Sequence, residues 1–340
     1  MNAETERLES CAAALCGAAG RPRPVRIEAL GGGRNNQVYR LESADGAAAV
    51  MKLYFRHDED ARDRLGHEWS FACHAWHRGV RALAEPLAMD RALHAALFAE
   101  LPGRACGQTD VTASSVAQAA AFLRAINADH DAVAALPIAS EACFSLAEHI
   151  ATVERRLARL AAMKKEGALH RMVRDFVLCD LLPGWHAVQR ALQGRAAEQG
   201  MEWHARLSEG AIILSPSDFG FHNALIDDDR IAFVDFEYAG CDDPAKLIGD
   251  FFNQVACPVS MHHLPVMLDA AAPRAEEAAR ARLLLPLYAV KWTAILLNDF
   301  LPTGAARRRF AMSGEEGERL AEQLAAARAK LGDLEVMLDA

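Results

Sequence analysis

Two short runs decide the fold of this 340-residue chain: LSPSDFGFHN at residues 214–223 and IAFVDFE at residues 231–237. Apolar residues typical of a buried strand precede the first run and open the second. Between them, three aspartates at 227–229 predict a tight turn, so that the residues on either side form a hairpin. A strand, a loop and a hairpin are therefore expected in succession.

This arrangement is predicted to bring Asp218, Asn223 and Asp235 to one edge. The set suits phosphoryl transfer, which needs a carboxylate beside the attacking hydroxyl and oxygen ligands for Mg²⁺. The spacing from Asp218 to Asn223 is the D-x-x-x-x-N of a kinase catalytic loop, and Asp235 stands where a metal-binding aspartate follows. The alternative is that these residues only flank turns. The apolar strands on both sides favour the functional interpretation.

Composition places the chain among globular proteins, with 52% hydrophobic and 24% charged residues. The length allows one large domain or two ordinary ones. A net charge of −9 argues against nucleic acid as a partner, and no apolar run reaches the roughly 18 residues of a membrane span. Eight scattered cysteines without a C-x-x-C pair or a signal peptide predict a cytoplasmic protein. The oligomeric state is not indicated.

The negative charge is concentrated in the second part of the chain. Residues up to Gly103 include 13 basic and 14 acidic side chains, which leaves 24 basic and 32 acidic beyond it, a net charge of −8. Because Glu237, Asp242 and Asp243 lie near the catalytic loop in sequence, we expect an acidic pocket for a cationic acceptor such as an amine-bearing alcohol. The alternative is a solvated acidic surface and a neutral or anionic acceptor.

The N-terminal part reads as a helix at 1–20 and then as strands. Strands at 26–30 and 38–41 flank the run GGGRNNQ at 31–37. Glycines here let the backbone approach a phosphate and turn its N–H groups toward it, although an ordinary turn explains them too. The candidate nucleotide-binding residues of this loop are Gly32, Gly33, Asn35 and Asn36.

Lys52 is a single lysine in an otherwise apolar strand at 47–54. An unpaired buried ammonium would be costly, and a kinase solves this by pairing the lysine with a glutamate on the following helix. Glu68, in the helical stretch 60–78, is the candidate. The alternative, a lysine that snorkels from an edge strand, ranks second because the glycine-rich hairpin, lysine and glutamate occur in kinase order.

A strand at 93–101 is expected to lead out of the first lobe, and beyond Gly103 the pattern is mainly helical. Ser145 and Glu148 form a predicted capping box. The predicted helices are 112–128, 145–163, 169–182, 185–198, 244–255, 264–271, 274–300 and 314–337, with a break at Pro183-Gly184.

From about Leu30 to Phe252 the chain resembles the aminoglycoside phosphotransferase and choline kinase family, which has a protein-kinase-like fold. The resemblance implies a two-lobed α+β protein. After the N-terminal helix at 1–20, a small antiparallel-sheet lobe would occupy 21–103 and a mainly helical lobe 104–340. It also implies transfer of the γ-phosphate of ATP, with Mg²⁺, to a hydroxyl of a small amine-, sugar- or choline-like molecule.

The resemblance also assigns roles to individual residues. Asp218 would be the catalytic base, Asn223 and Asp235 would hold Mg²⁺, Lys52 would bind phosphate with Glu68 as its partner, and Glu100 and Leu101 would contribute backbone groups to adenine. His222, Glu237 and Asp242 are candidate substrate residues because they lie near this set. Loop packing and solvation are the alternative explanations for His222 and Glu237.

One position departs from the family pattern. The family usually carries a histidine two residues before the catalytic aspartate, where this chain has Pro216. That histidine mainly braces the loop, so an active kinase remains the favoured hypothesis. A non-catalytic nucleotide-binding protein is the main alternative. A protein kinase ranks third, because no A-P-E-type segment follows Asp235.

Overall fold

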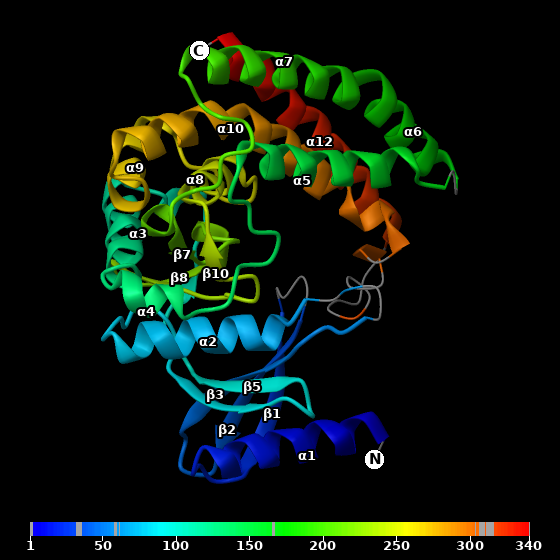
Figure 1. Ribbon diagram of the computed structural model, residues 1–340. Coiled ribbons are helices and arrows are strands. Elements are labelled where there is room, and N and C mark those ends of the chain that lie inside the picture. Colours follow the sequence, from blue (N-terminus) through cyan, green and yellow to red (C-terminus); the bar gives the residue numbers. More distant parts are fainter. Residues whose placement is uncertain are drawn as a thin grey trace.

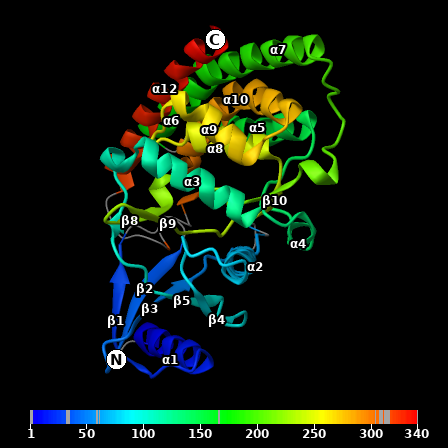
Figure 2. The ribbon, with the colours of Figure 1, turned by 90° about the vertical axis from the view of Figure 1, so that its left-hand side faces the viewer.

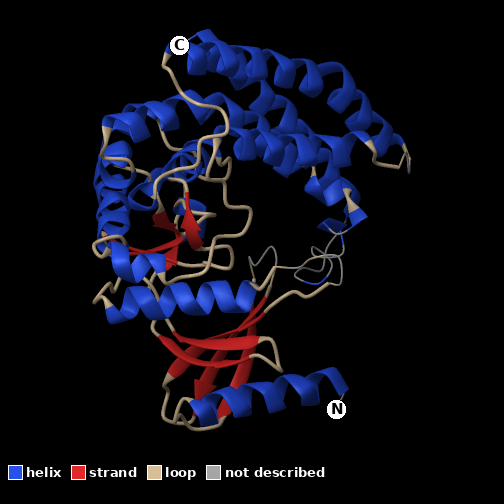
Figure 3. Cartoon of the chain, in the orientation of Figure 1, coloured by secondary structure: helices blue, strands red, loops and turns tan. Residues whose placement is uncertain are grey.

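The computed structural model describes residues 3–31, 36–57, 60, 62–164, 167–302, 304–305, 310 and 316–339. The chain forms two lobes, one built around an antiparallel sheet and a larger one made mainly of helices (Figure 1). Figure 3 shows the long strands gathered in the first lobe. This confirms the predicted fold class. In the part of the chain that the structure describes, no helix is both long and apolar enough to span a bilayer.

The sheet of the first lobe has five strands in the order β1-β2-β3-β5-β4, all paired antiparallel. Two helices accompany the sheet, and α2 lies between it and the helical lobe (Figures 1 and 2). The elements are α1 (Ala3–Ala18), β1 (Pro24–Leu30), β2 (Gln37–Ser43), β3 (Ala48–Leu53), α2 (Arg64–His77), β4 (Pro86–Asp90) and β5 (Ala95–Ala99).

The alternation of side chains in β3 decides which way Lys52 points. Ala49 and Met51 are buried in a small core with Leu15 and Cys16 of α1. Successive side chains of a strand face opposite sides of the sheet. The Lys52 side chain therefore projects from the face of the sheet opposite α1, toward α2 and the second lobe.

The helical lobe also contains short strands, and β6 already pairs with β8 directly after the chain leaves the sheet. Its elements are β6 (Arg104–Ala105), α3 (Ala113–Ile126), α4 (His130–Ala134), α5 (Leu146–Ala161), α6 (Ala168–Phe176), α7 (Leu182–Glu198), β7 (Ile213–Ser215), β8 (Ala224–Asp227), β9 (Arg230–Phe233), β10 (Gly240–Asp242), α8 (Pro244–Asn253), α9 (Leu264–Ala271), α10 (Ala275–Leu296) and α12 (Glu316–Asp339).

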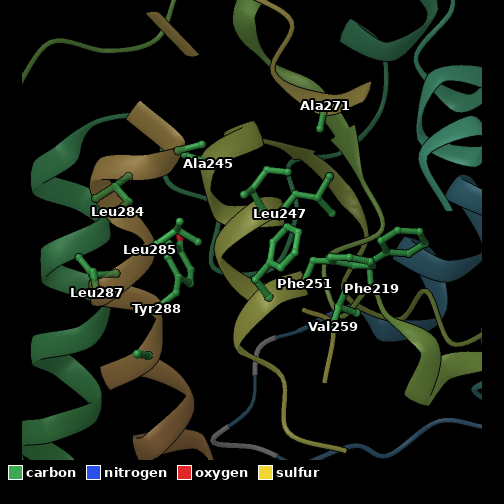
Figure 4. Close-up of a cluster of buried hydrophobic side chains, with 14 of the residues drawn as sticks. Phe219, Ala245, Leu247, Phe251, Val259, Ala271, Leu284, Leu285, Leu287 and Tyr288 are labelled. Carbon is green, nitrogen blue, oxygen red and sulfur yellow. The ribbon is translucent and has the colours of Figure 1, made fainter. Parts of the chain in front are cut away.

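Helix α8 forms the centre of this lobe, and every one of its residues is buried. Its Phe251 ring stacks on Phe219 of the predicted catalytic loop (residues 215–223), with centroids 5.7 Å apart (Figure 4). On its other side, Gly249 allows close contact with α10, because a Cβ at this position would lie 2.2 Å from the Tyr288 ring. The loop that carries Asp218 is therefore seated on the most buried helix of the molecule.

Two local predictions are corrected by the structure. Strand β4 is absent from the sequence prediction; it is a short edge strand that begins at Pro86, where a missing N–H costs no ladder bond.

The sequence predicts a helix break at Pro183-Gly184, but Pro183 lies in the first turn of α7. The irregularity comes earlier, as a π-helical turn at Val177–Leu181 in which Leu182 N–H donates to the Val177 carbonyl. The widened turn accommodates the proline without ending the helix.

Candidate active site

Lys52 lies at the centre of an ion cluster between the lobes. Its Nζ is 2.7 Å from Glu68 Oε1 and 2.9 Å from Asp235 Oδ1. Glu68 Oε2 also accepts a hydrogen bond from the Tyr54 hydroxyl at 2.7 Å. Burial opposes the charge on Lys52, but the carboxylates of Asp235 and Glu68 outweigh it and raise the pKa of the ammonium. The structure thus brings together Lys52 and the glutamate expected to pair with it.

Asp235 is held in an unusual backbone conformation where the chain leaves β9. Its φ is +70°, in the left-handed region that costs a non-glycine residue on the order of 1–3 kcal/mol. Neighbouring bonds hold this turn. Val234 N–H donates to the Asn223 carbonyl at 2.9 Å, and Phe236 N–H donates to Glu68 Oε1 at 3.4 Å. The carboxylate of Asp235 is thereby directed toward Lys52.

Contacts among its own residues hold the shape of the loop that carries Asp218. Asn223 Nδ2 donates to the Asp218 carbonyl at 2.9 Å, and His222 Nε2 lies 3.1 Å from Asp218 Oδ1. Ser217 has a φ of +65°, and its hydroxyl donates to the Tyr238 carbonyl at 2.8 Å. Asp218, His222 and Asn223 therefore lie together, and the loop is tied to the segment that follows Asp235.

These residues open onto one cavity of about 650 Å³. Asp218, Asn223, Asp235 and His222 all line it. Lys52 is not among the described lining residues, but its Nζ contacts Asp235, which is. A carboxylate on the catalytic loop and a carboxylate held by a buried lysine thus face a common space large enough for a small molecule.

The donor atoms here fit Mg²⁺. Asp235 offers a carboxylate and Asn223 an amide oxygen, since the Asn223 amide nitrogen is engaged with the Asp218 carbonyl. Among the described residues, no group of three or more His, Cys, Asp or Glu side chains is placed to hold a metal ion. A site with few protein ligands suits Mg²⁺, which keeps several waters and binds the phosphates of its substrate.

Glu237 and Asn36 form a buried contact behind this site. Asn36 Nδ2 donates to Glu237 Oε2 at 2.9 Å, and Asn36 Oδ1 accepts from Phe55 N–H at 3.1 Å. Arg64 Nε lies 3.1 Å from the same Glu237 oxygen. Burial, together with the nearby charge of Asp235, raises the pKa of Glu237 to about 7 despite Arg64. The structure thus places both residues in the protein interior.

Asp242 is also buried inside the helical lobe. It forms an ion pair with Lys246 and accepts hydrogen bonds from the N–H groups of Cys143 at 3.0 Å and Asp243 at 2.9 Å. Among the described residues that line the cavity, neither Asp242 nor Glu237 is found. From the negative charges of Asp242 and Glu237 the sequence predicted an acidic pocket. In the structure, Asp242 pairs with the buried Lys246 and Glu237 with the buried Arg64.

The remaining predicted nucleotide residues lie in two segments. Glu100 and Leu101 occupy the crossing between β5 and β6, and the Glu100 carboxylate accepts from Arg40 Nε at 2.6 Å. Gly32, Gly33 and Asn35 lie outside the described residues. Their roles stay predictions.

Several cavity residues are not anticipated from the sequence. Arg62, Glu141, Arg156, Lys291 and Trp292 all line the cavity. They come from segments far apart in the chain, so no local motif connects them. Only Lys291 carried a usable signal, because it interrupts an apolar stretch as Lys52 does, and it too has an acidic partner.

Comparison with known proteins identifies relatives of this architecture. The family model described as "Phosphotransferase enzyme family" matches residues 26–256, more than half of the chain. No curated protein matches the sequence.

Solved structures share the fold at low sequence identity. A choline/ethanolamine kinase family protein from Mesorhizobium loti is 18% identical with a TM-score of 0.62, over 98% of each chain. A spectinomycin phosphotransferase in complex with ADP and spectinomycin is 12% identical with a TM-score of 0.64, again over 98% of each chain. A choline kinase from Streptococcus pneumoniae is 13% identical with a TM-score of 0.59, over 98% of this chain and 100% of its own.

Proposed function

This chain belongs to the phosphotransferase enzyme family, and from that premise we propose that it transfers the γ-phosphate of ATP to a hydroxyl group of a small molecule. One observation carries the proposal. Lys52 contacts both Glu68 and Asp235, and Asp235 lines the same cavity as Asp218. Lys52, the proposed phosphate ligand, and Asp218, the proposed proton acceptor, are thus parts of one proposed site.

Asp218 is the proposed base. The acceptor hydroxyl oxygen forms the new bond to phosphorus, the bond to ADP breaks, and the hydroxyl proton passes to the Asp218 carboxylate. His222, 3.1 Å from Asp218 Oδ1, orients this carboxylate. The bond from the Asn223 side chain to the Asp218 carbonyl holds the backbone of the loop.

The nucleotide is proposed to bind between the lobes. Lys52 supplies the positive charge for its phosphates, and Glu100 and Leu101 offer backbone groups to adenine. Asn223 and Asp235 would hold Mg²⁺, which neutralises negative charge on the phosphates when bound.

A nucleotide-binding protein without catalysis is the second candidate, because Pro216 replaces the usual bracing histidine. Against it stands a different brace. The Ser217 hydroxyl bonds the Tyr238 carbonyl at 2.8 Å, which ties the loop to the segment after Asp235. The loop therefore has a tether that does not depend on position 216.

The deciding experiment offers the full-length protein γ-labelled ATP, Mg²⁺ and a small-molecule extract of the cells that supply the gene. We expect a labelled product with the wild-type protein and a strong reduction with Asp218→Asn. Nucleotide binding by calorimetry without any labelled product would support the second candidate. Failure to bind ATP or GTP under every metal condition would contradict both.

A further inference from the structure

Away from Asp218 and Asp235, the acidic side chains that line the cavity are paired with cations. The pairs are Asp60 with Arg64 at 2.7 Å, Asp250 with Lys291 at 2.8 Å and Asp299 with Arg319 at 3.4 Å. A carboxylate whose charge is already balanced attracts a cationic ligand only weakly. This part of the cavity therefore lacks the acidic character that net charge suggested.

Glu141 is shared by two arginines. Its Oε1 lies 3.1 Å from Arg62 Nη2, and its Oε2 forms an ion pair with Arg156. Although burial opposes its ionisation, Arg156 and Arg62 hold the pKa of Glu141 well below its ordinary range. The carboxylate is thus ionised and engaged at both oxygens, while two guanidinium groups share its single charge. Arg62 Nη1 also lies 3.7 Å from Asp60 Oδ2, so Arg62 divides its charge between two carboxylates.

Unused hydrogen-bond donors lie in the same wall. Arg156 and Ser140 line the cavity, and the buried Arg156 Nε and Ser140 hydroxyl have no hydrogen-bond partner among the described residues. A buried donor without an acceptor is destabilising, so an acceptor group of a ligand would be favoured here. Arg159, one turn after Arg156 on α5, is exposed, lines the cavity too, and has no ion pair within the part of the chain that the structure describes. Arg62 and Arg156 have carboxylate partners, so Arg159 is the arginine of this wall whose charge no described carboxylate balances.

We infer that the acceptor carries an anionic group, a carboxylate or a phosphate, which binds Arg62, Arg156, Arg159 and Ser140 while its hydroxyl group lies beside Asp218. Guanidinium groups bind both anions through paired, charge-assisted hydrogen bonds. This inference rests on the proposed phosphotransferase function. It replaces the cationic acceptor expected from the sequence.

The nucleotide does not account for Arg156 and Arg159. Arg156 and Arg159 lie on α5 of the helical lobe, whereas Lys52, the proposed phosphate ligand of ATP, lies on β3 of the sheet lobe. Figure 1 shows α5 along the side of the helical lobe that faces the sheet lobe. The cavity thus offers a second cationic region on another element, suited to the other substrate.

The first test separates the small-molecule extract by charge. Anion-exchange and cation-exchange steps yield anionic, cationic and neutral fractions, and each is incubated with the full-length protein, γ-labelled ATP and Mg²⁺. We expect labelled product from the anionic fraction. Product from only the neutral or cationic fraction would overturn the inference and leave the phosphotransferase function standing. Absence of product from all three would contradict the function itself, and the inference with it.

A phosphatase treatment then distinguishes the two anions. If the anionic fraction loses its acceptor activity after treatment and removal of the phosphatase, the anionic group is a phosphate monoester. If the activity is retained, the group is a carboxylate.

Variants of α5 provide the second test. Arg156→Gln and Arg159→Gln each remove a positive charge and are expected to raise the KM of the anionic acceptor about tenfold or more, with the KM of ATP little changed. The control is Arg155→Gln, an exposed residue that is not among the described cavity residues and whose side chain bonds Thr152. It should leave both constants unchanged. Arg159→Gln breaks no described ion pair, so an unchanged acceptor KM in that variant would count directly against the inference.

Discussion

Three structural features coincide at Asp235. Its backbone is strained at a φ of +70°, its carboxylate contacts Lys52 at 2.9 Å, and it lines the cavity with Asp218. Strain of this kind persists only where the surroundings hold it, and it gathers at functional sites. Ser217, with a φ of +65°, places a second strained residue directly before Asp218.

Replacing Asp218 by asparagine should remove the proton acceptor while keeping the size and polarity of the side chain. We expect kcat to fall by roughly 10²-fold or more, with nucleotide affinity little changed, because the base acts on the acceptor hydroxyl. The matched control is Asp227→Asn, at the end of β8, where the carboxylate bonds only the exposed Arg230 among its described contacts. Equal turnover in wild type and Asp218→Asn would mean that another group accepts the proton.

Asp235→Asn addresses the metal instead of the base. The amide keeps the shape but removes the charge that Mg²⁺ and Lys52 share, so the extra ATP affinity conferred by Mg²⁺ should shrink. Calorimetric titrations of ATP with and without Mg²⁺ measure this difference, and circular dichroism checks the fold. If Mg²⁺ strengthens ATP binding equally in both proteins, Asp235 is not the metal ligand.

At the level of elements, the helical lobe depends on the close packing of α8 against α10. Gly249→Ala would place a Cβ 2.2 Å from the Tyr288 ring, and this overpacking should lower the free energy of unfolding by about 1–3 kcal/mol. Gly194→Ala is the matched control, because this glycine lies in α7 and a Cβ added there would meet nothing within 4 Å. There the same change should be neutral or stabilise by up to about 1 kcal/mol. Denaturant unfolding of the two variants tests the contrast, and equal stabilities would contradict it.

Sequence patterns located most of the long elements, and the eight-residue helix α9 begins and ends at the predicted residues. The predictions were wrong where tertiary contacts determine the local structure. Pro183 signals a break in isolation, yet the π-helical turn at Val177–Leu181 absorbs it. In the site, the pair of Lys52 and Glu68 was predicted because Lys52 interrupts an apolar strand. The pair of Arg156 and Glu141 was not predicted, because no sequence motif connects these residues and only the fold brings them together.

For the whole molecule, the Glu141 cluster connects the two lobes. Arg62 lies in the segment between β3 and α2, and Arg156 lies on α5, so one carboxylate joins both sides of the cavity. Because the native pKa of Glu141 is lowered, its contribution to stability is complete above the ordinary value of 4.5 and is lost as pH falls toward the lowered value.

Glu141→Gln should therefore destabilise the protein by about 1.5–3 kcal/mol at neutral pH, the range for a hydrogen bond to a charged group. The difference from wild type should narrow as pH falls below 4.5, since protonation removes the same charge from the wild-type protein. Thermal unfolding at a series of pH values measures the gap. Glu154→Gln, an exposed change on α5, is the control, and a gap independent of pH would contradict the role given to Glu141.

The pairing of β6 with β8 has a consequence for motion. The strand that leaves the sheet lobe joins the hairpin next to Asn223, and Gly103 sits so close that a Cβ would lie 2.3 Å from the Ile226 carbonyl. Rotation of the sheet lobe about this point would work as a hinge with its pivot beside the catalytic loop. Such a rotation would carry Lys52 with the sheet lobe, whereas Asp218 and Asn223 would stay together in the helical lobe.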